Sequence, residues 1–160
     1  MRGIAVFILS ILSFSVFASN KILDVGLYWG EEPSEITVQA AQGSFKVYGN
    51  GKDLIELKKN TVLRIKSEGG LLHVRTLRED LGTYYKVELN RNSWGNTLKI
   101  QRAGRTAVHE YHDDFEMKPL RGKIRIINHV YIEHYVAGVV ESEAGSKEPK
   151  EYYKVQAVIC

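Results

Sequence analysis

The sequence predicts an α+β fold, in which a predominantly antiparallel β module is followed by two C-terminal helices. Two observations predict it. Over residues 21–118, short segments rich in β-branched and aromatic residues are separated by turns rich in Gly, Asn and Pro, a pattern typical of β-sandwiches and open barrels. After residue 131 the apolar residues instead recur every three or four positions, which is the period of an amphipathic helix.

Residues 1–18 are predicted to be a signal peptide. Arg2 supplies a positive charge, residues 4–17 are apolar except for serines, and the segment ending at Ala18 fits the small-residue cleavage pattern. Because the apolar segment is short for a membrane span, we expect cleavage and no stable membrane span afterwards, with an uncleaved anchor as the alternative. The mature protein is therefore expected to be exported, either periplasmic, associated with the cell wall or extracellular.

Residues 19–160 are predicted to form one domain, with residues 19–118 rich in β-structure and residues 119–160 carrying the helices. The domain is expected to be incomplete, because the second helix stops in mid-pattern at Cys160 without a Gly cap or a polar tail. One cysteine excludes an internal disulfide. The net charge of +3 is too small and too scattered to indicate a nucleic acid partner.

The elements follow from the local pattern in chain order. The strands expected in the β module cover residues 22–28, 35–40, 44–48, 54–57, 61–66, 71–76, 84–89 and 97–102. A further strand is expected over residues 121–127, and Asn128 is expected to turn the chain into the first helix. The first helix is expected to end at Gly145, and the second to begin near Pro149.

Glu143 is the carboxylate that the helical pattern singles out. It lies four positions after Val139 and seven after Val136, so it continues the apolar stripe and is expected to face the packed side. Glu133 and Glu141 are expected on the opposite, wetter face. Burial and the negative end of the helix dipole both favour the protonated carboxyl, which is the form that acts as a general acid. The alternative on spacing alone is a structural glutamic acid bonded to backbone.

Gln156 lies within the apolar stripe of the second predicted helix. A Gln among core residues needs a hydrogen-bond partner, which is either local backbone or a sugar hydroxyl. His134 lies off the stripe of the first helix and is expected at the surface. Aromatic residues that could stack on sugars, although core or cross-strand packing is their commoner role, are Tyr28, Trp29, Tyr84, Tyr85 and Trp94.

One segment contains several residue types that bind metal ions, but its pattern does not favour a metal site. The segment around His109 and His112 continues into Asp113, Asp114 and Glu116. It lacks the residue order of known zinc motifs and stands between strand-like segments. A solvated acidic loop is therefore expected, and no metal site is predicted.

Ordered blocks within residues 120–160 resemble the core motif of the stage II sporulation protein D and amidase enhancer (SpoIID/LytB) family. They are Leu120-Arg121-Gly122, Ile126-Ile127-Asn128-His129-Val130, Glu133-His134-Tyr135, Gly138-Val139-Val140-Glu141-Ser142-Glu143 and Lys154-Val155-Gln156-Ala157-Val158. Ala144 replaces the Met of the family motif, and Leu120 replaces its Tyr. The family motif continues with Arg-Thr-Tyr beyond Cys160, so the resemblance implies a domain truncated within its core motif.

The resemblance implies an exported bacterial protein that acts on peptidoglycan. In the family, the matching Glu is the acid and base of a lytic transglycosylase, so the catalytic residue would be Glu143. Substrate would be bound by Gln156, Tyr135 and Ser142, and the reaction would need no cofactor. The alternative is a non-catalytic module that binds the cell wall or activates a cell-wall amidase. Because the family's Arg would follow Cys160, we expect this chain to be inactive alone.

Overall fold

The protein is described by a computed structural model, which covers residues 21–144. These residues form twelve β-strands and one α-helix. In chain order the elements are β1 (Ile22–Leu27), β2 (Glu35–Gln42), β3 (Ser44–Gly49), β4 (Lys52–Lys58), β5 (Leu63–Glu68), β6 (Leu71–Thr76), β7 (Asp80–Tyr84), β8 (Val87–Arg91), β9 (Thr97–Arg102), β10 (Val108–His112), β11 (Asp114–Leu120), β12 (Lys123–Tyr131) and α1 (Ile132–Ala144).

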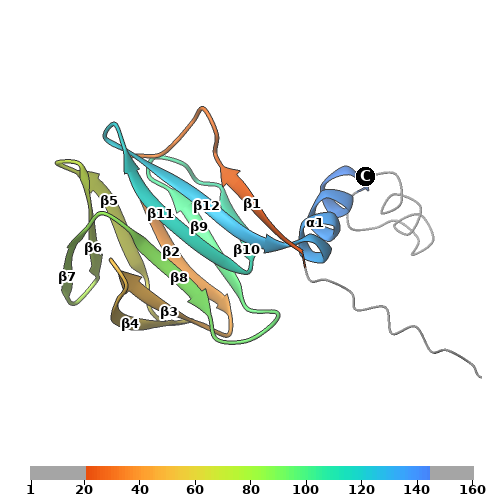
Figure 1. Cartoon of the computed structure of the whole chain (residues 1–160), viewed down its shortest axis with the longest axis horizontal. Helices are drawn as coiled ribbons and strands as arrows, with labels where there is room; N and C mark the ends of the chain where they lie inside the picture. Colours follow the sequence, from red (N-terminus) through yellow and green to blue (C-terminus); the bar gives the residue numbers. More distant parts are fainter. Residues whose placement is uncertain (1–20, 145–160) are drawn as a thin grey trace, which may run out of the picture.

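Two six-stranded sheets face each other (Figure 1). The first sheet has the order β1-β12-β11-β8-β3-β4, and the second has the order β10-β9-β2-β5-β6-β7. Every strand pair is antiparallel. The predicted antiparallel β module is therefore confirmed, and of the two expected architectures it is the sandwich that forms.

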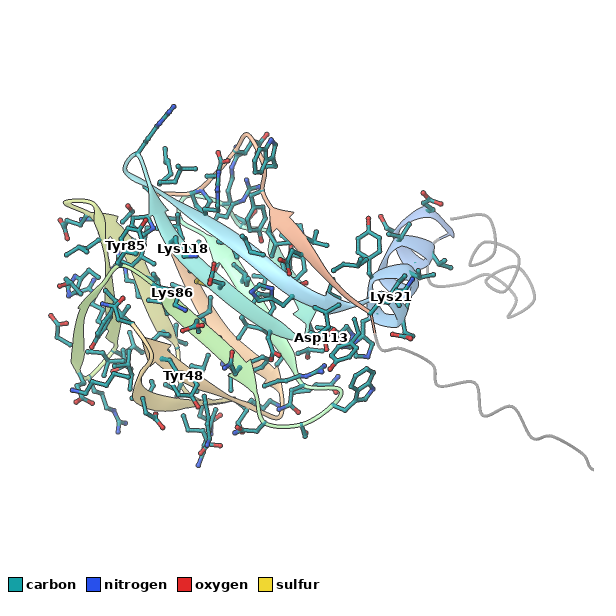
Figure 2. The ribbon with its side chains drawn as sticks, viewed as in Figure 1. Lys21, Tyr48, Tyr85, Lys86, Asp113 and Lys118 are labelled. Carbon is teal, nitrogen blue, oxygen red and sulfur yellow. The ribbon has the colours of Figure 1, made fainter. Side chains whose placement is uncertain are left out.

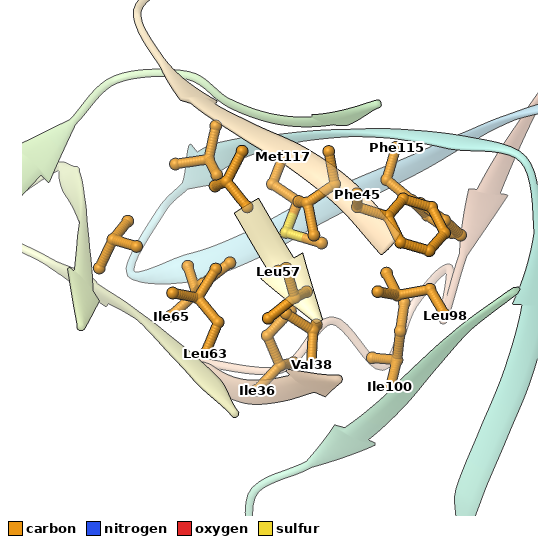
Figure 3. Packing of buried hydrophobic residues seen from close by; sticks show 14 of the residues in the cluster. Ile36, Val38, Phe45, Leu57, Leu63, Ile65, Leu98, Ile100, Phe115 and Met117 are labelled. Carbon is orange, nitrogen blue, oxygen red and sulfur yellow. The ribbon is translucent and has the colours of Figure 1, made fainter. Parts of the chain in front are cut away.

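The core lies between the two sheets, because the central strands alternate buried apolar residues with more exposed polar residues. In β5, for example, Leu63 and Ile65 are fully buried while Arg64 between them is exposed. Phe45 and Phe115 belong to strands β3 and β11 of the first sheet, and their rings meet in the core with their centroids 6.3 Å apart (Figure 3). Burying one such side chain stabilises the fold by about 1.5–3 kcal/mol relative to leaving it exposed.

Most predicted strands are confirmed within a few residues, but three strands were not expected. These are β7, β10 and β11. Strands β7 and β10 lie at the two edges of the second sheet and contain no buried residue, so they lack a clear apolar alternation. In β11 the residues Phe115 and Met117 do alternate with polar neighbours, but the preceding acidic run hides the pattern.

The helix begins at Ile132, directly after β12 and three residues later than a cap at Asn128 would place it. The backbone N–H of Ile132 donates to the carbonyl of Lys21, at 3.0 Å, which ties the start of α1 to the residue before β1. In Figure 1, α1 lies beyond the ends of β1 and β12, at one end of the sandwich. The signal peptide, the helix end at Gly145, the second helix and Cys160 fall outside the described residues. Within residues 21–144, no helix is long and apolar enough to cross a membrane.

Candidate functional site

A groove of about 570 Å³ lies between α1 and the strands β1, β10 and β12. We call it the α1 groove. Its floor is apolar, with Val25, Leu27 and Val130 from the first sheet. The wall formed by α1 consists of His134, Tyr135, Gly138, Val139, Glu141, Ser142 and Glu143. Three predicted site residues therefore share one wall, namely Tyr135, Ser142 and Glu143, whereas Gln156 lies outside the described residues.

The predicted burial of Glu143 is wrong for the described part of the chain, where the residue is exposed. Val140 is only 5 % exposed, and the three residues that follow it, 141–143, are exposed. Glu143 lies almost one turn further along the helix than Val140. The apolar stripe thus gives the side of α1 that faces the protein but not the length over which it is covered. Glu141, which was expected on the opposite face, lines the same groove.

The most buried polar residue near α1 is Asp113, which was expected to lie in a solvated loop. Asp113 connects β10 to β11, where the chain passes from the second sheet to the first. It is 0 % exposed and has a φ of 72°, a left-handed conformation that Asp adopts more readily than most residues. Figure 2 shows it at the α1 end of the sandwich. The expectation of a solvated loop is therefore wrong.

Three groups hold the carboxylate of Asp113. Its Oδ2 accepts hydrogen bonds from the backbone N–H of Tyr131, at 2.9 Å, and from Nδ1 of His134, at 2.8 Å. Its Oδ1 pairs with the guanidinium of Arg91, whose side chain is 10 % exposed. A buried carboxylate is tolerated only when it is paired and hydrogen-bonded in this way. The contacts join β8, β12 and α1 at one point.

Aromatic rings surround the side chains of Arg91 and His134, two of the groups that contact Asp113. The guanidinium carbon of Arg91 lies 4.7 Å from the ring centroid of Trp94 and 4.7 Å from that of Tyr131. The imidazole of His134 lies between Trp94 and His112, with both centroid distances 4.5 Å. We call these six residues the corner cluster: Arg91, Trp94, His112, Asp113, Tyr131 and His134.

His134 is not the surface histidine that the sequence predicts, because its side chain is only 16 % exposed. Burial, and then the nearby charge of Arg91, lower its pKa from the ordinary value of 6.5. Burial likewise lowers the pKa of His112, with further lowering from His134. Both imidazoles are therefore neutral at neutral pH.

Asn128 supports the corner cluster rather than turning the chain. It lies within β12, which continues to Tyr131, so the turn predicted at this residue is wrong. Its side chain is buried, and its Nδ2 donates to the carbonyl oxygens of His112, at 2.8 Å, and Asp114, at 3.0 Å. These two bonds hold the backbone on both sides of Asp113.

The arrangement restricts the chemistry that the described residues can perform. Ser142 follows His134 by eight residues, about 12 Å along a helix axis, so a Ser-His-Asp triad with Asp113 is not formed. Among residues 21–144, no group of three or more His, Cys, Asp or Glu side chains is arranged to hold a metal ion. The groove contains the carboxylates of Glu141 and Glu143 on the C-terminal half of α1 and the oriented imidazole of His134 in its first turn. His109, Glu110 and His112 of β10 also line it.

The five aromatic residues considered for sugar stacking fall into two groups, those that pack against the core and those that are exposed. Tyr28 and Tyr84 pack against the core. Trp29, Tyr85 and Trp94 are 75 %, 58 % and 56 % exposed. Of these three, only Trp94 belongs to the corner cluster.

Residues 120–160 match the family model described as Stage II sporulation protein (SpoIID). This confirms the resemblance over the last quarter of the chain. No curated protein and no solved structure is significantly similar to the chain. The matched segment contains Asn128, His134 and Glu143, whereas Arg91 and Asp113 precede it.

Proposed function

We propose that the protein is exported and acts on peptidoglycan, cleaving glycan strands by a lytic transglycosylase-type reaction with Glu143 as general acid and base. One observation carries the proposal. Glu143, Ser142 and Tyr135 line one wall of the α1 groove, within the segment that matches the SpoIID family model. A groove of about 570 Å³ is in the size range of sites that bind small molecules or short segments of a polymer.

One carboxylate is sufficient for this reaction. The Glu143 carboxyl donates its proton to the glycosidic oxygen as the bond to the anomeric carbon breaks. The resulting carboxylate then takes the proton of the muramoyl 6-hydroxyl, whose oxygen attacks the anomeric carbon and closes an anhydro ring. Because the nucleophile belongs to the substrate, the second carboxylate of ordinary glycosidases is not required.

Because Glu143 is exposed, the bound glycan itself must shield the carboxyl from water during the reaction. A strand lying in the α1 groove covers the wall that carries Glu143 and displaces water from it. Tyr135, which is 41 % exposed, offers a ring face for a sugar, and Ser142 offers a hydroxyl. Proton transfer thus takes place in surroundings that the substrate completes.

A second candidate function is a non-catalytic module that binds the wall or activates a cell-wall amidase. The exposed position of Glu143 favours it, since the described residues do not enclose the carboxyl. The exposed rings of Trp29 and Tyr85, far from α1 in sequence, also suit a binding surface.

Analysis of reaction products separates the two functions. Purified bacterial sacculi are incubated with the protein at its full natural length, with a cell-wall amidase, or with both, and the soluble products are identified by mass spectrometry. The transglycosylase releases anhydromuramoyl fragments without the amidase. The activator releases none, but increases the amount of free stem peptide that the amidase produces. If neither product increases, both candidate functions are wrong.

A further inference from the structure

The α1 groove also contains His134, a polar residue that the proposed reaction does not use. We propose that His134 forms a sugar-binding subsite, in which Nε2 accepts a hydrogen bond from a glycan hydroxyl and Asp113 is the positioning residue that fixes the imidazole. The subsite rests on the proposed function, because the glycan is the ligand that the function supplies. It extends that function by a contact at the end of the groove opposite Glu143.

The imidazole is held more firmly than a surface contact requires. Asp113 binds its Nδ1 at 2.8 Å, and the same carboxylate is fixed by the N–H of Tyr131 and by Arg91. The rings of Trp94 and His112 both pack against the imidazole, with centroid distances of 4.5 Å, which restricts its rotation. A side chain that is oriented before the ligand arrives loses little entropy on binding.

Holding Nδ1 also determines what Nε2 can do. An ionised carboxylate only accepts hydrogen bonds, so Nδ1 carries the hydrogen and Nε2 of the neutral ring carries a lone pair. The charged groups around His134 are Arg91, Asp113 and Glu133. Burial and the charge of Arg91 lower the pKa of His134, so the ring is neutral. Nε2 makes no hydrogen bond with any residue between 21 and 144, and His134 lines the groove.

The spacing along α1 makes His134 a binding residue, not the partner of Glu143 in breaking one bond. They are nine positions apart, about 13.5 Å along a helix axis. The acid and base that act on one glycosidic bond are about 5–9.5 Å apart. A glycan strand lying along α1 therefore has its cleaved bond at Glu143, passes Tyr135, and places a more distant sugar against His134.

Two substitutions at His134 separate binding from a purely structural role. Asn places its amide near the position of Nδ1, so His134→Asn retains a donor for Asp113 but loses the acceptor. Gln reaches toward the position of Nε2, so His134→Gln retains an acceptor but loses the donor. The probe is a peptide-free tetrasaccharide of alternating N-acetylglucosamine and N-acetylmuramic acid. Its affinity is measured calorimetrically in the Glu143→Gln protein, which does not cleave it.

We expect His134→Asn to weaken tetrasaccharide binding about two- to twelvefold, the range for one neutral hydrogen bond, and to lower the melting temperature less than His134→Gln does. His134→Gln should retain more of the affinity but melt at a lower temperature. In nitrogen NMR, the Nε2 signal of His134 should shift when the tetrasaccharide is added. A structural role for His134 predicts unchanged affinity in the Asn variant and an unchanged Nε2 signal.

The possible results also separate this subsite from the proposed function. If the tetrasaccharide binds and perturbs signals of Tyr135 but neither His134 variant alters its affinity, the subsite is wrong and the proposed function stands. If no tetrasaccharide binds to the Glu143→Gln protein or to the unaltered one, the proposed function is wrong and the subsite fails with it.

Discussion

Asp113 and His134 are joined by a hydrogen bond of 2.8 Å between Oδ2 and Nδ1. This bond links two parts of the chain with different roles. Asp113 lies where the chain crosses from one sheet to the other, and His134 lies in the first turn of the helix that carries Glu143. The position of Glu143 relative to the sandwich therefore depends on a buried ion pair and an imidazole outside the apolar core.

The corner cluster should contribute strongly to stability. Asp113→Ala leaves Arg91, only 10 % exposed, without its partner, and breaking a buried ion pair in this way costs about 3–5 kcal/mol. Asp24 provides a matched control, because it also pairs with a histidine, at 2.6 Å, but is 68 % exposed. Asp24→Ala should cost less than about 1 kcal/mol. Urea denaturation measures both changes, and similar losses for the two variants would contradict the assigned role of the cluster.

Stability should decrease as the pH falls below about 6.5. The pKa values of His112 and His134 are lower in the folded protein than their ordinary value of 6.5, so the unfolded chain binds more protons in this range. Their contribution is fully present above pH 6.5 and is lost between that value and the lower folded pKa values. Urea denaturation at several pH values should show this slope.

The double variant His112→Phe, His134→Asn tests whether these two histidines cause the loss of stability below pH 6.5. It removes both imidazoles while retaining a ring at one position and a donor for Asp113 at the other. The decrease in stability just below pH 6.5 should become shallower in this variant. An unchanged slope would assign the pH dependence to other groups.

Filling the α1 groove should block glycan binding without unfolding the protein. Gly138 lines the groove, and a Cβ added there has no atom within 4 Å outside the helix's own backbone. Gly138→Phe should therefore reduce affinity for the peptide-free tetrasaccharide at least about tenfold, while the loss of a helical glycine maintains or raises stability. Ala137→Phe is the control, since Ala137 is exposed and does not line the groove. Equal affinities in the two variants would place the binding site elsewhere.

Export should remove residues 1–18. The positive charge at Arg2, the apolar segment and the pattern ending at Ala18 occur together at the N-terminus. N-terminal sequencing of the protein recovered from outside the cytoplasmic membrane should therefore begin at Ser19. Recovery only from the cytoplasm, with Met1 retained, is the opposite result.

The sequence was sufficient for an antiparallel β module and for α1, because both leave local periodic patterns, whereas the choice between sandwich and barrel was left open. Alternation within short segments indicates strands, and the spacing of Val136 and Val140 indicates which side of the helix packs. The extent of the packing partner leaves no such pattern, so the exposure of Glu143 was not predictable. The identification of the α1 groove required both sheets and the helix to be placed in space.

The corner cluster was missed for a different reason. Its members Arg91, Asp113 and His134 come from separate elements, and only folding brings them together. One signal was present: Phe115 and Met117 alternate with charged residues directly after the acidic run. That alternation indicates a strand, which places Asp113 at a tight connection rather than in a solvated loop. The ion pair itself has no local signal.

The central claim is that Glu143 transfers the proton in glycan cleavage. Mass spectrometry of fragments released from peptide-free glycan strands tests it most directly, using the protein at its full natural length, unaltered and with the substitutions Glu143→Gln and Glu133→Gln. Glu133 is the control because it is an exposed carboxylate of the same helix that does not line the groove. We predict anhydromuramoyl fragments from the unaltered protein and from Glu133→Gln, and at least about 100-fold fewer from Glu143→Gln. Equal yields from Glu143→Gln and the unaltered protein, or no anhydromuramoyl fragment from any of the three, would contradict the account.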